Sequence, residues 1–300
     1  MSSVSLDQAT TVDIGLKGKV SAYIELTKPR IALLLVLVSA AAFYLASPSP
    51  LNYVLFAHSM IAITLLAFGV ATLNQWLERD IDPLMKRTLG RPIPSGRVSQ
   101  TEALVFGALL CIAAEVYLAL AVNLLTAALG LVVIVGYVLV YTPLKTRTSA
   151  STAIGAIPGA MPPLMGWTAA ADSISIAAWG LFAMQFLWQF PHFFAIAWMY
   201  RDQYKNAGIK MLPVVEKDGS LTFRQIVLFT VMLIPISISP YVFGVSGEIF
   251  FVGAVVLGLW HLVESIVTAK RKSDKAARRL LLVTVLYLPL LFLLMVIDKR

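Results

Sequence analysis

The feature that most constrains this chain is a series of long apolar runs that recurs along nearly its whole length. The runs cover residues 31–46, 53–77, 102–121, 124–141, 152–170, 175–199, 223–243, 248–268 and 280–297. Most approach the roughly 20 residues that a helix needs to cross a membrane, while the first and last rely on flanking residues. With 59% hydrophobic and only 13% charged residues, the pattern predicts an all-α, polytopic membrane protein with nine transmembrane helices.

The basic residues fall almost entirely on one side of this predicted bundle. Of the 24 Lys and Arg, all but Lys299 and Arg300 lie in the N-terminal segment or in the connections 78–100, 142–151, 200–224 and 269–279. The alternate connections contain none, and this asymmetry places the basic side in the cytoplasm, with the N-terminus inside and the C-terminus outside. We therefore expect a multi-pass protein of the cytoplasmic (inner) membrane and no nucleic-acid partner. The basic block 270–279 also suits contact with anionic lipid, although positive-inside anchoring is the simpler interpretation.

The rest of the composition narrows the chemistry. Cys111 is the only cysteine and lies in an apolar run, which excludes an intrachain disulfide and a thiolate metal site. The first 22 residues are polar and lack the apolar core of a signal peptide, so we predict a mobile cytosolic tail. A single membrane domain is expected over 23–300, opening with an interfacial segment in which Pro29 suits the first turn of a helix.

The stretch 74–97, NQWLERDIDPLMKRTLGRPIPSGR, is where acids and bases are packed together. Asn74, Glu78 and Asp82 are spaced four apart, which on a helix drifts by about 40° per step and keeps the three on one face. Pro83 should end that helix, and the cations Lys86, Arg87, Arg91 and Arg97 follow. Oxygen ligands at a helix end suit Mg²⁺, and neighbouring cations suit phosphate. We predict a magnesium–diphosphate site; the alternative is a polar loop whose basic residues only orient it.

A second polar cluster lies in the run 175–199. Gln185, Gln189 and His192 share one face of an apolar, aromatic helix, as expected for side chains that face the bundle interior. His192 either contacts substrate or is an interhelical hydrogen-bond partner. Asp202, at the mouth of this helix, is either a further carboxylate for Mg²⁺ or an acid paired with Arg201.

The region after the fourth run adds two more cations, Lys145 and Arg147, and then the segment GAIPGAMPPLMGW at 155–167. Small residues allow close helix approach and prolines leave room for a cavity. Glu115 is an intramembrane acid without an evident partner in the sequence.

Several motifs in one order resemble a known family. They are LTKPRI (26–31), NxxxExxxD (74–82) with MKRT and RPIPSGR, YTPLK (141–145), GAxPGAxPPLxGW (155–167), WQFPHF (188–193) and AGIKMLP (207–213). From about residue 23 to the C-terminus the chain resembles the protoheme IX farnesyltransferases (heme O synthases), a branch of the UbiA-type intramembrane prenyltransferases. The resemblance implies a nine-helix bundle with a central cavity open to the cytoplasm.

The resemblance also implies an activity and its residues. Farnesyl is transferred from farnesyl diphosphate to the vinyl group of heme b with addition of water, giving heme O. Asn74, Glu78 and Asp82 match the Mg²⁺-diphosphate motif, and Gln189 and His192 match the WQxPH signature. The matching substrate-binding positions are Lys86, Arg87, Arg91, Lys145, Arg147, Asp202 and Tyr204. The family usually has an acid where this chain has Gln203, so Asp202 is expected to supply the second metal-binding arm from one position earlier.

The predicted chemistry is dissociative. Mg²⁺ and the cations neutralise the departing diphosphate, and an apolar cavity keeps water from the allylic cation. For His192 we favour a hydrogen bond to Gln189 over contact with the heme iron or the vinyl-derived cation. Besides membrane lipid, other assembly proteins of heme oxidases are expected partners. The rival hypotheses are a UbiA-type enzyme for a quinone precursor or a chlorin, and a heme carrier without catalysis.

Overall fold

The computed structural model describes residues 14–216 and 218–300, which are almost entirely helical apart from loops and one isolated β-bridge between Ser246 and Lys299. The long helices are α2 (Pro29–Ala46), α3 (Tyr53–Leu77), α4 (Gln100–Ala121), α9 (Ile176–Met199), α12 (Ser220–Val242), α13 (Glu248–Arg271) and α14 (Asp274–Ile297). The shorter ones are α1 (Gly15–Leu26), η1 (Asp82–Leu84), α5 (Leu124–Val133), the π-helical η2 (Ile134–Tyr141), α6 (Thr142–Leu144), α7 (Ser151–Gly159), α8 (Met161–Ala171), α10 (Arg201–Asn206) and α11 (Leu212–Val215).

Seven helical spans in the described part of the chain are long and apolar enough to cross a membrane. They are α2, α3, α4, the continuous stretch from α5 to α6, α12, α13 and α14, which makes this a multi-pass integral membrane protein. The predicted count of nine is not confirmed. The run 152–170 is divided into α7 and α8 because Pro162 and Pro163 follow the break, and α9 is long enough but carries three polar side chains.

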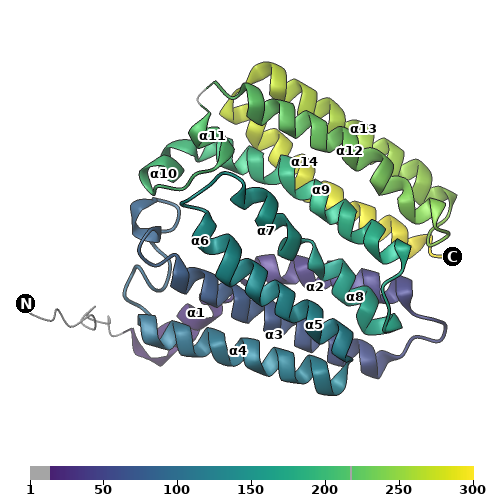
Figure 1. The fold of residues 1–300 in the computed structure, drawn as a ribbon, viewed down its shortest axis with the longest axis horizontal. Helices are drawn as coiled ribbons and strands as arrows, with labels where there is room; N and C mark the ends of the chain where they lie inside the picture. Colours follow the sequence, from purple (N-terminus) through teal and green to yellow (C-terminus); the bar gives the residue numbers. More distant parts are fainter. Residues whose placement is uncertain (1–13, 217) are drawn as a thin grey trace, which may run out of the picture.

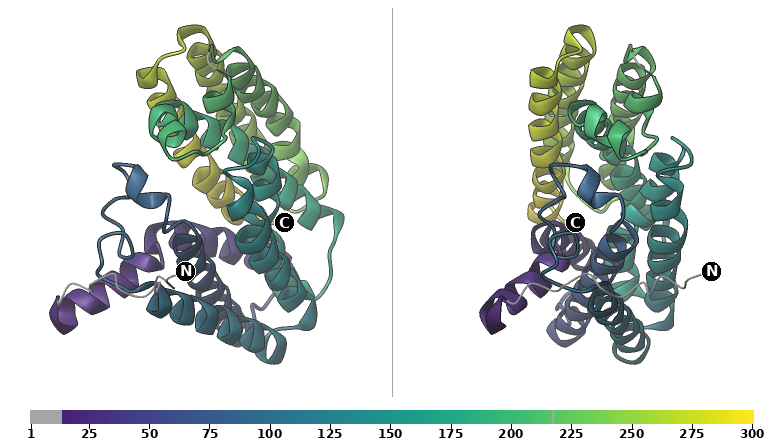
Figure 2. Two further views of the ribbon diagram at one scale, coloured as in Figure 1. Left: turned by 60° about the vertical axis from the view of Figure 1, so that its left-hand side comes forward. Right: turned by 90° about the vertical axis from the view of Figure 1, so that its left-hand side faces the viewer.

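The helices form two packed groups (Figure 1). The first group contains α2 to α8, and its most extensive contacts are those of α3 with α4 and of α2 with α8. The second group contains α9, α12, α13 and α14, which pack against one another. Contacts of α14 with α2, and of α9 with α7 and α8, join the groups, which Figure 2 shows from two further directions. Close packing is visible at α2 and α8, where a Cβ on Gly166 would collide with the backbone of Ser39.

The long connections gather at one end of the bundle (Figure 1). The loop between α3 and α4 lies there beside α10 and α11, whereas the C-terminus lies at the opposite end. At that opposite end Lys299 donates to the carbonyls of Tyr44 and Ser47, both at 2.7 Å. The two basic residues outside the main set therefore sit at the end opposite to the rest, as the charge pattern predicts.

Helix α1 differs from the sequence-based expectation. It begins at Gly15, so the last part of the segment predicted to be a mobile tail is helical. Ala22 is fully buried, and Lys19 pairs with Glu102 of α4 at 2.7 Å. The remainder of the predicted tail, residues 1–13, lies outside the described residues. The predicted domain boundary at residue 23 therefore falls inside a helix.

Candidate active site

The candidate site is built on the end of α3. The helix ends at Leu77, six residues before Pro83, rather than running to the proline as predicted. The chain nevertheless continues in turns of helical spacing, because Glu78 N–H donates to the Asn74 carbonyl at 3.0 Å and Asp82 N–H to the Glu78 carbonyl at 2.9 Å. The i, i+4, i+8 spacing thus keeps its effect, and all three side chains are buried.

Arg91 is the centre of the cluster. Its Nη1 atom donates to both carboxylate oxygens of Asp82 at 2.7 Å and to Oε2 of Glu78 at 3.1 Å. The guanidinium returns from the loop that follows η1, and the Asp82 side chain is completely buried beneath it. The two carboxylates are therefore aimed at one point, and that point holds positive charge.

Two lysines complete the cluster from other parts of the chain. Lys145, just after α6, bonds to Oε1 of Glu78 at 2.5 Å. Lys28, between α1 and α2, donates to Oδ1 of Asn74 at 2.8 Å. The Asn74 amide in turn donates to the hydroxyl of Thr142 at 3.1 Å, which fixes its oxygen toward Lys28. Three separate connections thus converge on the oxygens of the α3 motif.

Lys28 belongs to the segment that the sequence predicts to be interfacial, and it was not among the predicted site residues. The structure places it in the cluster because its backbone is left-handed (φ 49°) and turns the chain into α2. The signal was present in the sequence as a lysine directly before the proline that opens the first span. Lys28 belongs to the site because α2 begins beside the end of α3, a contact that the sequence does not show.

The electrostatics follow from burial of opposite charges together. Burial alone would raise the pKa of Glu78, but Lys145, Lys28 and Arg91 outweigh it and lower the value to about 2. Burial lowers the pKa of Lys28 to about 7, with help from Arg91. Burial raises the pKa of Asp82, and the charge of Arg91 offsets that only in part. The Glu78 carboxylate therefore stays ionised at neutral pH.

The donor set suits a hard divalent cation. Two carboxylates and one amide oxygen converge, and each already contacts a cationic nitrogen. Mg²⁺ commonly binds through one or two carboxylates and takes its other ligands from water and phosphate. No group of three His, Cys, Asp or Glu side chains lies close enough for a metal anywhere in residues 14–216 and 218–300. Asp202 therefore does not join Glu78 and Asp82, contrary to the sequence-based expectation.

The segment that follows α9 contributes hydrogen bonds and ring contacts to the site rather than acids. Arg87 donates from Nη2 to the hydroxyl of Tyr204 at 3.1 Å, and its backbone N–H donates to Oε1 of Gln203 at 3.2 Å. The guanidinium also lies over the rings of Tyr200 and Tyr204. Gln203 thus anchors the loop of the first motif through the backbone of Arg87.

Three predicted site residues lie outside these contacts. The side chains of Lys86, Arg147 and Asp202 are exposed, and none pairs with an acid or base in the described part of the chain. Arg201, the other partner considered for Asp202, pairs with Asp274 of α14 at 2.6 Å. Both predicted roles of Asp202 thus lack support in the geometry.

On α9 the two glutamines face the break between α7 and α8. Gln185 donates to the carbonyl of Gly159 at 2.8 Å, and Gln189 donates to that of Ala156 at 2.9 Å. The Gly159 carbonyl would normally accept from the residue four positions later, which is Pro163 and has no N–H. Gln185 supplies the missing donor, which explains an amide inside the bundle.

His192 has a different partner from the one expected. Its Nδ1 lies 2.9 Å from the hydroxyl of Thr284 on α14, and its ring stacks on Trp188 at 4.7 Å. The preferred interpretation, a hydrogen bond to Gln189, is therefore wrong. The three side chains that were predicted to share one face of α9 therefore have different partners. The two glutamines bond to α7, and His192 bonds to α14.

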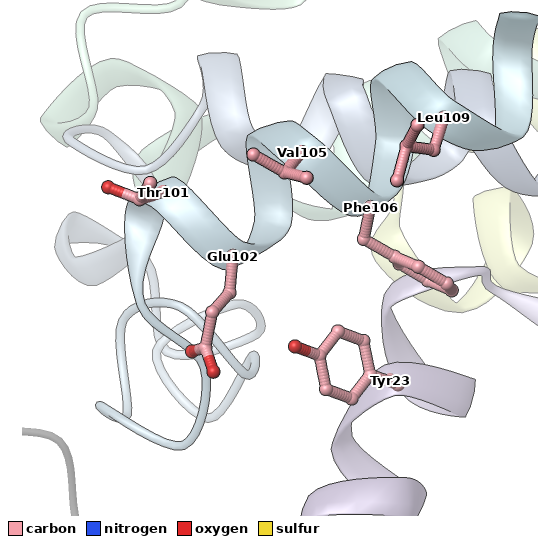
Figure 3. A pocket seen from close by; sticks show the side chains of 6 residues that line it. All are labelled: Tyr23, Thr101, Glu102, Val105, Phe106 and Leu109. Carbon is pink, nitrogen blue, oxygen red and sulfur yellow. The ribbon is translucent and has the colours of Figure 1, made fainter.

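An open groove of about 490 Å³ lies away from the charged cluster, between α1 and α4 (Figure 3). Its walls are mostly apolar and include Tyr23, Val105 and Phe106, with the Glu102 carboxylate at one end. It borders none of the predicted site residues.

The chain can be compared with known proteins. The model of the UbiA prenyltransferase family matches residues 34–295. Similar curated proteins include the protoheme IX farnesyltransferases of Solibacter usitatus, 47% identical over 92% of this chain and 98% of that one, and of Koribacter versatilis, 44% identical over 92% and 93%.

Solved structures share the fold at low sequence identity. A structure from work on digeranylgeranylglyceryl phosphate synthase superposes with a TM-score of 0.79 at 16% identity, over 93% of this chain and 98% of that one. A UbiA homologue from Archaeoglobus fulgidus bound to DMAPP and Mg²⁺ gives 0.65 at 15% identity, over 91% and 98%. Because the family model spans most of the chain, this protein belongs to the UbiA prenyltransferase family.

Proposed function

We propose that this protein transfers the farnesyl group of farnesyl diphosphate to the vinyl group of heme b, with addition of water, giving heme O and diphosphate. The observation that carries the proposal is the convergence of Glu78 and Asp82 on the Nη1 atom of Arg91 at the end of a membrane helix. The choice of substrates rests on the relatives, which are named protoheme IX farnesyltransferases and match over nearly their whole length.

Asn74, Glu78 and Asp82 would hold a Mg²⁺ ion in this proposal, because their oxygens already face cationic groups. When bound, Mg²⁺ supplies positive charge that stabilises the departing diphosphate. The related structure from Archaeoglobus fulgidus was obtained with DMAPP and Mg²⁺. Asp202 is left out of the metal set, because its side chain is exposed and apart from the two carboxylates.

The cations of the cluster bind the diphosphate. Lys28, Arg91 and Lys145 each hold a motif oxygen in the free protein and are placed to turn to phosphate oxygens when substrate arrives. Arg87 is held above two tyrosine rings, and the exposed Lys86 and Arg147 provide the first attraction at the rim. Phosphate would thus be retained at the polar end while the farnesyl tail enters the apolar bundle.

The residues of α9 position the acceptor. Gln189 donates to the Ala156 carbonyl and so holds the end of α7, where the chain breaks before α8. His192 lies one turn closer to the polar end, with its ring stacked on Trp188. Tyr204 closes the mouth through its bond to Arg87. We propose that heme b lies along this wall, in the central cavity expected for the fold, with its vinyl group toward the allylic carbon.

In this proposal the polar end of the bundle faces the cytoplasm, across the cytoplasmic (inner) membrane from the C-terminus. This follows from the basic residues gathered at that end and from the C-terminus at the other. Both substrates then enter from the inner leaflet or the cytosol, and partners that deliver heme or receive heme O would approach there.

The test uses purified full-length protein in detergent with heme b, farnesyl diphosphate and Mg²⁺. We expect a heme product heavier by a hydroxyfarnesyl addition in the mass spectrum, lost with EDTA and restored by magnesium. The same assay with an aromatic quinone precursor or a chlorin tests the rival acceptors. A protein that binds heme but yields no farnesylated heme would act as a carrier, and the proposal would be wrong.

A further inference from the structure

A buried polar stripe on α13 takes no part in the site described above. It consists of His261, Glu264, Ser265 and Thr268, at positions i, i+3, i+4 and i+7 on one face of the helix. All four are between 0% and 3% exposed, although the helix crosses the membrane. Ionisable residues inside a membrane are costly and commonly mark proton or ion pathways.

The stripe faces polar groups on both neighbouring helices. From α12, Thr230 lies 3.0 Å from Ser265. From α14, Thr268 meets the carbonyl of Ala276 at 3.3 Å, and Arg279 bonds to Glu264 at 2.5 Å. The Arg279 side chain is 63% exposed, so this end of the stripe reaches the polar end of the bundle.

The deep end of the stripe approaches α9. His261 lies beside Tyr287 of α14, with ring centres 5.1 Å apart, and the Tyr287 hydroxyl bonds to Ser237 of α12 at 2.7 Å. One turn along α14, Thr284 bonds to His192. Polar groups thus lie in sequence from His192, across α14 and along α13 from His261 to Thr268, which are about 10 Å apart along the helix axis.

Helix association alone does not account for this stripe. Polar residues that only join helices find partners, but both ring nitrogens of His261 and Oε2 of Glu264 are buried without one in the described residues. A buried polar atom without a partner is destabilising, because it loses its hydrogen bonds to water and gains none in return. Groups that exchange protons, in contrast, need free positions to accept and release them.

The proposed reaction creates a need for such groups. The C–O bond of the allylic diphosphate breaks and farnesyl carbon bonds to the terminal vinyl carbon, which leaves a cation next to the porphyrin ring. Water oxygen bonds to that carbon and one proton is released, with no oxidation or reduction. At the mouth of the site Arg91 is a permanent cation and Lys145 is paired with Glu78, so neither has a free basic position for this proton.

We propose that His192, Thr284, Tyr287 and the α13 stripe form a proton route that carries this proton to Glu264 and the polar end of the bundle. The inference rests on the proposed function. The titratable and charged groups that face His261 and Glu264 are His192 from α9 and Tyr287 and Arg279 from α14. His261 and Glu264 touch no reacting atom and act as relay groups.

The test compares His261→Ala and Glu264→Gln with the wild type in the heme assay, in H₂O and in D₂O. We expect each variant to turn over about tenfold more slowly or worse, because relayed proton transfer contributes at least that much. The solvent isotope effect on turnover should rise, and imidazole in the buffer should partly restore His261→Ala. His58→Phe is the matched control, since His58 is a membrane histidine paired with Tyr117 on the other side of the bundle.

The outcomes separate the two proposals. No farnesylated heme from the wild type would overturn the proposed function and this inference with it. Product from the wild type, with folded variants that show an unchanged rate or an unchanged isotope effect, would overturn the proton route alone. Should His261→Ala fail to fold, Glu264→Gln decides, because it keeps the shape of the side chain and an oxygen for Arg279.

Discussion

The two long connections at the polar end of the bundle follow similar helices but are built differently. After α3 the acids are buried and paired, and Asp82 is completely enclosed beneath Arg91. After α9 the acid Asp202 is exposed and unpaired in the described chain, while the buried member is the aromatic Tyr204. The difference suggests a division of roles that can be tested: the first connection carries the buried charges, and the second holds the Arg87 part of that connection through Gln203 and Tyr204.

The largest effect that tests this division compares Asp82→Asn with Asp202→Asn. Removing the Asp82 charge leaves the metal site with one carboxylate, and we expect turnover to fall about 100- to 1,000-fold, the usual cost of losing one group that stabilises developing charge. Asp202→Asn should stay within about twofold, because surface changes away from contacts are nearly neutral. Steady-state rates of heme farnesylation measure both.

A thermal melt in detergent is the control for folding in both variants. Comparable losses of activity in the two folded variants would contradict the division, because the second connection would then also supply a metal-binding acid. Full activity of Asp82→Asn would remove the metal assignment itself.

A second prediction concerns the competition between Arg91 and metal. In the free protein the guanidinium contacts three carboxylate oxygens, so a divalent ion must share them or displace it. We expect Arg91→Gln to bind Mn²⁺, a probe for Mg²⁺, about tenfold more tightly than the wild type, because a nearby positive charge is removed. The same variant should bind inorganic diphosphate more weakly. Isothermal titration with each ligand alone measures both affinities.

Arg147→Gln is the matched control for Arg91→Gln, because it removes one cation from the same end of the bundle without touching a carboxylate. Its affinity for metal alone should not change. Weaker metal binding by Arg91→Gln would show that the guanidinium holds the carboxylates ready for the ion instead of competing with it.

Sequence reasoning was most successful where the information is local. The start of α3 follows from an apolar run, although the helix ends six residues before the proline that was expected to stop it. The gathering of Asn74, Glu78 and Asp82 follows from a spacing that turns preserve after the helix ends. The positions of the cations along the chain also predicted which end of the bundle is polar. Periodicity and charge are properties of short segments, so they can be read without a structure.

The parts that could not be predicted depend on contacts between distant segments. Lys28 reaches Asn74, 46 positions away, because a left-handed residue turns α1 into α2. His192 bonds to Thr284, 92 positions away, instead of its neighbour Gln189. Gln185 is explained only by a carbonyl that Pro163 leaves free across the bundle. Spacing shows which residues share a helix, but the partner that each one finds is decided by packing.

The smallest predicted effect tests the support that the second connection gives. Tyr204→Phe keeps the buried ring and its contact with the Arg87 guanidinium but removes the hydroxyl that accepts from Nη2. A hydrogen bond to a charged group contributes about 1.5–3 kcal/mol at most in buried settings, and Arg87 is exposed, so we expect the KM for farnesyl diphosphate to rise only about fivefold. The rate at saturation should stay nearly constant if the hydroxyl only positions the Arg87 cation. The same two constants measured for Gln203→Ala distinguish the two residues that hold the loop after α3. Gln203 accepts from the backbone N–H of Arg87, so its loss should displace the loop backbone as well as the Arg87 side chain. A large fall in the saturated rate of Tyr204→Phe would instead place the tyrosine hydroxyl at the reacting atoms and give the second connection a direct share in the chemistry.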